Sequence, residues 1–190
     1  MSTLKIVCIG DSLTEAYGIP ATFGWTYLLS KELPVQVINS GISGDTTAGM
    51  LARFQFMVIA HKPSCVIITG GTNDLSLDVP NSLILSNILG MARLAKHFQI
   101  SVIIGIPPPF FCEDNLPDPS VFLSPVNLMK RLEKFRKHLR KFAQEEDLPL
   151  IDFSLNMTPK HFLEDGLHPN KTGHKIMKDT AKIVLRNVVL

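Results

Sequence analysis

Val7-Cys8-Ile9-Gly10-Asp11-Ser12-Leu13 is the stretch that decides how this chain is expected to fold. Residues Leu4 to Ile9 form a largely apolar run, rich in β-branched side chains, that ends at Gly10. This pattern is typical of a strand buried on both faces. The chain then turns at Gly10-Asp11-Ser12, so Ser12 is expected just beyond the carboxyl end of the strand. In open parallel α/β sheets the ligand crevice lies outside those ends, so a hydroxyl there is placed for chemistry.

Strand-like and helix-like segments alternate along the rest of the chain, which is typical of α/β proteins. We therefore predict a three-layer α/β/α, flavodoxin-like doubly wound fold with five parallel strands in the order 2-1-3-4-5, formed by residues 1–190 as one domain. A proline-rich loop is expected at 107–123. The expected strands are 4–9, 35–39, 64–69, 100–106 and 150–153, and the expected helices are 25–33, 47–61, 81–98, 125–146 and 172–188.

Composition excludes several classes of protein. With 190 residues and 45% hydrophobic residues, the chain is long and apolar enough to bury a core. A net charge of +2 argues against an obligate nucleic-acid binder. No apolar run reaches the length of a membrane span, so we expect no stable membrane insertion.

The cysteines and the first residues bear on location. Cys8, Cys65 and Cys112 are scattered and odd in number, which predicts neither a disulfide framework nor a metal site. The chain enters the first strand almost at once, which leaves no room for a signal peptide. We expect either a cytoplasmic protein or one whose leader has been removed, and in both cases no metal or cofactor.

Four polar clusters fall in the expected loops: Gly10-Asp11-Ser12-Leu13, Ser43-Gly44-Asp45, Gly71-Thr72-Asn73-Asp74 and Asp165-Gly166-Leu167-His168-Pro169. The first three follow strands one to three, and the fourth comes after strand five. Because parallel strands end at the same edge, all four clusters are expected to meet there.

The residue types in these clusters suit acyl transfer. A serine nucleophile needs a base, and a histidine base needs an acceptor on its other ring nitrogen, so we assign Ser12 as nucleophile, His168 as base and Asp165 as the orienting carboxylate. The backbone N–H groups of Ser12 and Gly44 and the side-chain amide of Asn73 are candidate oxyanion donors.

These four blocks resemble the SGNH, or GDSL, hydrolases, and the resemblance extends from residue 10 to residue 169. Within that family the chain looks most similar to the small esterases of the thioesterase I/lysophospholipase L1/arylesterase type. The resemblance implies an esterase or lipase-type hydrolase of carboxylic esters or thioesters that works through a Ser12 acyl-enzyme, with the same triad and oxyanion donors. The expected substrates are small acyl esters, lysophospholipids or acyl thioesters.

Several residues keep two interpretations. Leu75, Leu77, Phe110 and Phe111 either line an apolar acyl pocket or anchor loops to the core, and we assign them to substrate binding. The basic residues 130–141 form either a membrane-facing helix or, as we favour, a solvated face. The remaining histidines are expected at the surface: His61, His97, His138, His161 and His174.

Two other functions compete with this one. A carbohydrate O-acetylesterase would use the same machinery with a shallow cleft that accepts only acetyl groups. A flavodoxin-like phosphate- or nucleotide-binding module would use backbone N–H groups at a helix N-terminus instead. Such a module has no need of Asp165 and His168.

Overall fold

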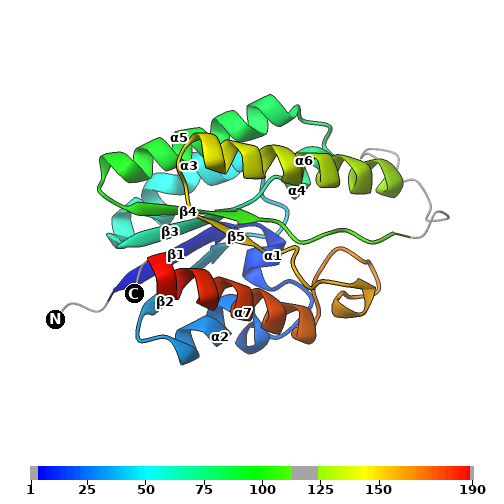
Figure 1. Ribbon diagram of the computed structural model, residues 1–190, viewed down its shortest axis with the longest axis horizontal. Helices are drawn as coiled ribbons and strands as arrows, with labels where there is room; N and C mark the ends of the chain where they lie inside the picture. The colour runs from blue at the N-terminus through cyan, green and yellow to red at the C-terminus, as the bar shows by residue number, and fades with distance from the viewer. Residues whose placement is uncertain (1–3, 113–123, 189–190) are drawn as a thin grey trace.

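A sheet of five parallel strands forms the centre of the computed structural model, which describes residues 4–112 and 124–188 (Figure 1). The strand order is β2-β1-β3-β4-β5, and every neighbouring pair is parallel. The predicted fold class and strand order are therefore confirmed. The strands are β1 (Lys5–Gly10), β2 (Gln36–Gly41), β3 (Cys65–Thr69), β4 (Ser101–Ile106) and β5 (Leu150–Asp152).

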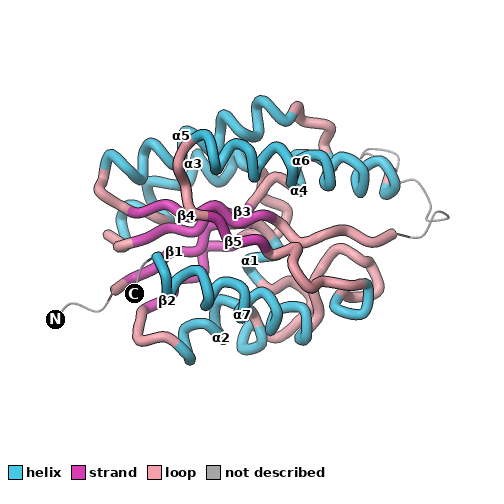
Figure 2. Tube along the Cα trace, viewed as in Figure 1, coloured by secondary structure: helices cyan, strands magenta, loops and turns pink. Residues whose placement is uncertain are grey.

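Helices cover both faces of the sheet and complete the three layers (Figure 2). One face carries α3 (Thr47–Met57), α5 (Asn81–His97) and α6 (Pro125–Glu145). The other face carries α2 (Trp25–Glu32) and α7 (Lys171–Val188). The shorter elements are α1 (Ser12–Glu15), α4 (Thr72–Ser76), η1 (Ala21–Phe23), η2 (Ile59–His61) and η3 (Pro159–His161).

The alternation of side chains along β1 explains the two cores. Val7 and Ile9 pack into the cluster under α3, α5 and α6, whereas Ile6 and Cys8 pack into the cluster under α2 and α7. Successive residues of a strand point to opposite faces of the sheet. Because helices cover both faces, all four side chains are buried. A strand covered on both sides has no polar face, which is why its sequence reads as a continuous apolar run.

Helix α3 and the segment that begins at Ser12 differ clearly from the prediction, whereas the bounds of the strands shift by one or two residues. The helix expected at 47–61 ends at Met57, and a 3₁₀ turn continues to His61. Lys62 then adopts a left-handed conformation before Pro63, and its N–H closes the 3₁₀ turn by donating to the Ile59 carbonyl. The turn expected at Gly10-Asp11-Ser12 leads directly into the short helix α1, which was not predicted and whose N-cap Asp11 accepts a hydrogen bond from the Leu13 N–H.

The basic helix α6 carries several paired charges. Ion pairs join Arg131 to Asp78, Lys137 to Glu133, Arg140 to Asp152 and Lys141 to Glu145. Its apolar stripe, which includes Leu132 and Phe135, faces the core. The expected proline-rich loop has no regular structure at 107–112, and its residues 113–123 lie outside the described residues. No described helix is long and apolar enough to cross a membrane.

The register of the three adjacent strands β2, β1 and β3 places their carboxyl ends at one level. Gly10 pairs with Gly41 on one side and with Thr69 on the other. Helix α1 lies directly against the end of β2. The approach is so close that a Cβ on Gly41 would be 2.3 Å from the Glu15 backbone nitrogen. Only glycine allows this approach.

We expect Gly41→Ala to lower the free energy of unfolding by about 2 kcal/mol or more, since the added methyl meets backbone atoms that cannot move aside. Gly90→Ala in α5 is the matched control. A Cβ there finds ordinary contacts with Leu51 at 3.5 Å, so this variant should be stabilised by roughly 0.5–1 kcal/mol. Urea unfolding of both variants checks the prediction, and equal stability of the two would contradict it.

Candidate active site

Ser12 lies at the carboxyl end of β1 and is the first residue of α1. The preceding Gly10 allows this sharp turn, because a Cβ there would be 2.1 Å from the Thr14 Oγ1 atom. The Ser12 side chain is only 8% exposed. Its backbone N–H belongs to the first turn of a helix, where N–H groups have no acceptor within the helix.

His168 joins Ser12 to Asp165. Its Nε2 atom lies 3.0 Å from Ser12 Oγ, and its Nδ1 atom lies 2.7 Å from Asp165 Oδ2. Asp165 Oδ1 accepts hydrogen bonds from the backbone N–H groups of Leu167 and His168, at 2.8 and 2.9 Å. The structure thus brings the three predicted side chains into one hydrogen-bonded chain across 156 residues of sequence.

The surroundings of Asp165 keep its carboxylate charged. Partial burial alone would raise the pKa of Asp165, but the hydrogen bonds from the backbone and ring of His168 and from Leu167 outweigh it. The pKa therefore lies below its usual value. A carboxylate that stays ionised can hold the His168 Nδ1–H and stabilise an imidazolium.

Tyr17 packs against His168, a contact that was not predicted from the sequence. Its ring centroid lies 4.6 Å from that of His168, and the two rings are tilted by 44°. The side chain is half exposed, so it covers one face of the imidazole at the surface. The only signal in the sequence was its position five residues after Ser12.

Gly44 and Asn73 contribute donors from the loops after β2 and β3. Gly44 has a positive φ of 79°, and a Cβ there would meet nothing within 4 Å, so its surroundings are open. No acceptor among the described residues takes the Gly44 N–H. The Asn73 Nδ2 atom donates to the Asp45 carbonyl at 2.9 Å, and its second hydrogen remains available.

A buried network fixes these two loops to each other. Asp74 is 1% exposed and accepts from both the backbone N–H and the hydroxyl of Thr47, at 2.9 and 2.6 Å. The amide of Asn87 also donates to this hydroxyl. Asp74 therefore caps no helix of its own but holds the start of α3 against α4, which carries Asn73.

Arg53 of α3 is a second support that the sequence did not reveal. Its guanidinium donates to the carbonyls of Gly10 and Ser40 and pairs with Asp45 at 2.7 Å. These partners are the ends of β1 and β2 and the loop beside Gly44. One planar group with several donors thus links the segments that carry the candidate nucleophile and a candidate oxyanion donor.

The carboxyl group of Asp11 titrates near neutrality. Burial, together with the charges of Asp74 and Asp45, raises its pKa to about 7 against the lowering effect of the Leu13 N–H. Its Oδ2 atom is buried and has no partner among the described residues. Its other oxygen, Oδ1, accepts the Leu13 N–H, so Asp11 caps α1.

His174 corrects one expectation, because it is buried and not at the surface. Its first-turn position in α7 faces the core, and it is 1% exposed. The Nδ1 atom accepts the Trp25 N–H at 3.3 Å, and the Trp25 indole donates to the Leu13 carbonyl. The other four histidines, His61, His97, His138 and His161, are exposed or partly exposed as expected.

The candidate substrate-binding residues separate in the structure. Leu75 is fully buried in the core under α5 and α6, so its assignment to a substrate pocket is wrong: the first turn of α4 points it inward. Leu77 is 49% exposed just after α4. Phe110 and Phe111 line a separate cavity of about 210 Å³ beside Met129 and Arg136.

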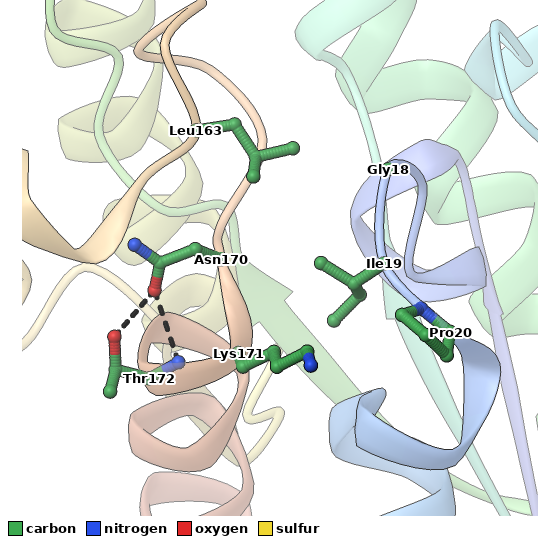
Figure 3. Close-up of a pocket in the computed structure, with 7 residues that line it drawn as sticks. All are labelled: Gly18, Ile19, Pro20, Leu163, Asn170, Lys171 and Thr172. Carbon is green, nitrogen blue, oxygen red and sulfur yellow. Dashed lines mark hydrogen bonds between the residues drawn. The ribbon is translucent and has the colours of Figure 1, made fainter.

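A larger cavity of about 400 Å³ lies between the segment Gly18–Pro20 and residues that flank His168 in the sequence (Figure 3). The Leu163 N–H donates to the His168 carbonyl at 2.8 Å, and Gly18 follows Tyr17 directly. The described residues form no cluster of histidine, cysteine and acidic side chains suited to a metal ion. The cavity is lined by Gly18, Ile19, Pro20, Leu163, Asn170, Lys171 and Thr172.

Comparison with known proteins identifies the family. The GDSL-like lipase/acylhydrolase family matches residues 8–176. The chain belongs to this family. It is therefore an acyl hydrolase, the class of enzyme that cleaves carboxylic esters and thioesters, and the expected family and reaction class are confirmed.

Relatives and solved structures of this family resemble most of the chain. An arylesterase of Vibrio mimicus is 32% identical over 177 residues, which cover 87% of this chain and 80% of the relative. The thioesterase 1/protease 1/lysophospholipase L1 of Escherichia coli K12 is 28% identical over 183 residues, covering 92% and 79%. A G-D-S-L lipolytic protein of Desulfitobacterium hafniense has a TM-score of 0.81 at 26% identity, covering 96% and 100% of the two chains.

We expect Arg53→Met to lower kcat by roughly tenfold and the free energy of unfolding by about 2–4 kcal/mol, because it leaves Asp45 and two strand-end carbonyls without their partner. Arg93→Met, at an exposed position of α5, is the control and should change neither value. Ester hydrolysis and urea unfolding measure both effects. An unchanged kcat in Arg53→Met would exclude a role in positioning the site.

Burial lowers the pKa of His174 to about 4, assisted by the nearby charge of His168. An unfolded histidine binds a proton near pH 6.5, so the folded state loses stability as pH falls from 6.5 to 4. Between pH 7 and pH 5 we expect His174 alone to remove on the order of 2 kcal/mol. His174→Gln should reduce this loss in urea unfolding, and the exposed-site control His97→Gln should not. Equal pH dependence in all three proteins would contradict the assignment.

Proposed function

We propose that the chain hydrolyses acyl esters or thioesters through a covalent Ser12 acyl-enzyme. The observation that carries this proposal is the position of His168, whose two ring nitrogens lie within hydrogen-bond distance of Ser12 and Asp165. A phosphate-binding loop would need no imidazole at this place. The binding-module alternative therefore has no support in the geometry.

Each residue has a defined role in the proposed reaction. Ser12 Oγ attacks the acyl carbon while its proton moves to His168 Nε2, and Asp165 stabilises the resulting imidazolium. The developing oxyanion accepts hydrogen bonds from the backbone N–H groups of Ser12 and Gly44 and from the Asn73 amide. Arg53 and Asp74 act as positioning residues, since they hold the loops that carry these donors.

The second half of the reaction uses the same groups. The C–O or C–S bond breaks as His168 returns the proton to the leaving group. His168 then takes a proton from water, whose oxygen attacks the acyl carbon. The bond between the acyl carbon and Ser12 Oγ breaks, and His168 returns the proton to Ser12 Oγ as the acid leaves. No metal or cofactor is required for any of these steps.

We propose small acyl esters, lysophospholipids or acyl thioesters as substrates, in line with the names of the similar relatives. Exposed Leu77 follows the helix that carries Asn73 and is a candidate contact for the acyl chain. A carbohydrate O-acetylesterase differs in accepting acetyl groups only. The acyl-chain-length dependence of hydrolysis separates these possibilities.

We also propose a reducing, cytoplasmic setting. Cys8 and Cys65 are buried thiols without a disulfide, and burial raises the pKa of both. Such thiols behave as small core side chains, and free cysteines are typical of reducing compartments. Fractionation of the source cells tests this location, and recovery of the protein outside the cytoplasm would exclude it.

Hydrolysis of p-nitrophenyl esters from acetate to palmitate tests the proposed mechanism. We expect Ser12→Ala to lower kcat by about 10³-fold or more, because no other hydroxyl replaces the nucleophile. Ser86→Ala, on the exposed face of α5, is the matched control and should retain full activity. Substantial hydrolysis by Ser12→Ala would refute the acyl-enzyme. An optimum at acetate would favour the O-acetylesterase, and a longer optimum the lipid-type substrates.

A further inference from the structure

The leaving group of a substrate must lie near His168, and the cavity between Gly18–Pro20 and the residues that flank His168 in the sequence is a candidate place for it. The same Nε2 atom that accepts the Ser12 proton also gives it to the leaving oxygen or sulfur, so that atom must come within hydrogen-bond reach of Nε2. The carbonyl oxygen, by contrast, points to the donors of Gly44 and Asn73. The rest of the leaving group therefore extends away from those donors, along the His168 side of the site.

Two loops next to His168 form the cavity walls. One wall is the segment Gly18–Pro20, which follows the Tyr17 ring packed against His168. The other is formed by Leu163, which bonds to the His168 backbone, and by the first residues of α7. Each wall thus connects to His168, one through the Tyr17 ring and the other through the backbone hydrogen bond of Leu163.

We propose that this cavity is the subsite for the alcohol or thiol leaving group. It selects a leaving group that combines an apolar body with a negatively charged substituent. This inference rests on the proposed function and adds the chemistry of the leaving group to it. A volume of about 400 Å³ is sufficient for an aromatic ring or a short branched chain.

The lining explains the selectivity for apolar groups. Figure 3 shows the Ile19 side chain pointing from one loop toward the wall that carries Leu163 and Asn170. Pro20 adds apolar surface beside Ile19. The polar atoms of Asn170 are already engaged, because its Oδ1 accepts from Thr172 and its Nδ2 donates to backbone carbonyls. They therefore offer little to a polar ligand.

Lys171 gives the cavity its charge. Its side chain extends from the start of α7 toward Pro20 (Figure 3), and its Nζ atom lies 4.1 Å from the centroid of the Phe23 ring. No carboxylate in the described part of the chain forms an ion pair with it, and none of the seven lining residues is acidic. A negative group on the substrate would meet an ammonium held in place by an aromatic face.

The test uses butyrate esters that share one acyl group and differ only in the alcohol: methyl, phenyl, 3-carboxyphenyl and 3-(trimethylammonio)phenyl. All four form the same acyl-enzyme, so differences in kcat/KM arise before the alcohol leaves. Comparing ratios between variants of the full chain cancels the intrinsic reactivity of each ester. The variants are Lys171→Glu, Ile19→Trp and the control Lys175→Glu, which makes the same charge change at another exposed position of α7.

We expect Lys171→Glu to lower the ratio of kcat/KM for the anionic ester to that for the cationic ester by about tenfold. Lys175→Glu should change this ratio less than twofold. Ile19→Trp fills the cavity and should lower the phenyl-to-methyl ratio by about tenfold. The preference for acyl-chain length among p-nitrophenyl esters should remain that of the unchanged protein.

Three results would overturn the inference. They are an unchanged charge ratio in Lys171→Glu, an equal change in Lys175→Glu, and a shift of acyl-chain preference in Ile19→Trp, which would place the acyl group in the cavity. Failure of the proposed function looks different, because ester hydrolysis would then persist in Ser12→Ala whatever the alcohol.

Discussion

The level alignment of the carboxyl ends of β2, β1 and β3 is the constraint on which the site depends. Gly10 pairs with Gly41 and Thr69, so the loops that follow these strands begin side by side. Arg53 bonds to two of the strand ends, and the Asp74–Thr47 pair holds the loops after β2 and β3 together. The proposed nucleophile and oxyanion donors are thus positioned by the sheet and its supports, and a shift in strand register would separate them.

The fold and the triad were predictable because their signals are local. Apolar runs of five or six residues and amphipathic segments between them determine the alternation of strands and helices. Ser12, Asp165 and His168 follow predicted strands, and their residue types are those that acyl transfer requires. The approximate bounds of the longer elements followed as well, whereas the four-residue helix α1 depends on a single cap by Asp11 that a pattern of hydrophobic residues does not reveal.

Other features depend on contacts that no local pattern records. Arg53 bonds mainly to backbone carbonyls, which every residue has, so nothing in the sequence distinguishes it from the exposed Arg93. Leu75 lies in α4 and Leu77 just after it, only two positions apart, yet Leu75 is in the core and Leu77 is half exposed. His174 is buried because α2 and α7 pack against each other, and the partner it requires, Trp25, lies 149 residues away.

The separation of Ser12 and His168 in the sequence has a consequence for biosynthesis. Ser12 is made early, whereas His168, to which it bonds, follows 156 residues later. At elongation rates of about 5–20 residues per second, roughly 8–30 seconds pass between the two events. During this interval Ser12 has no base. The strand β1 is central in the sheet, and the strands that pair with it are synthesised after it. The proposed reaction needs His168, so the nascent polypeptide cannot hydrolyse an ester until that residue has been made and lies against Ser12.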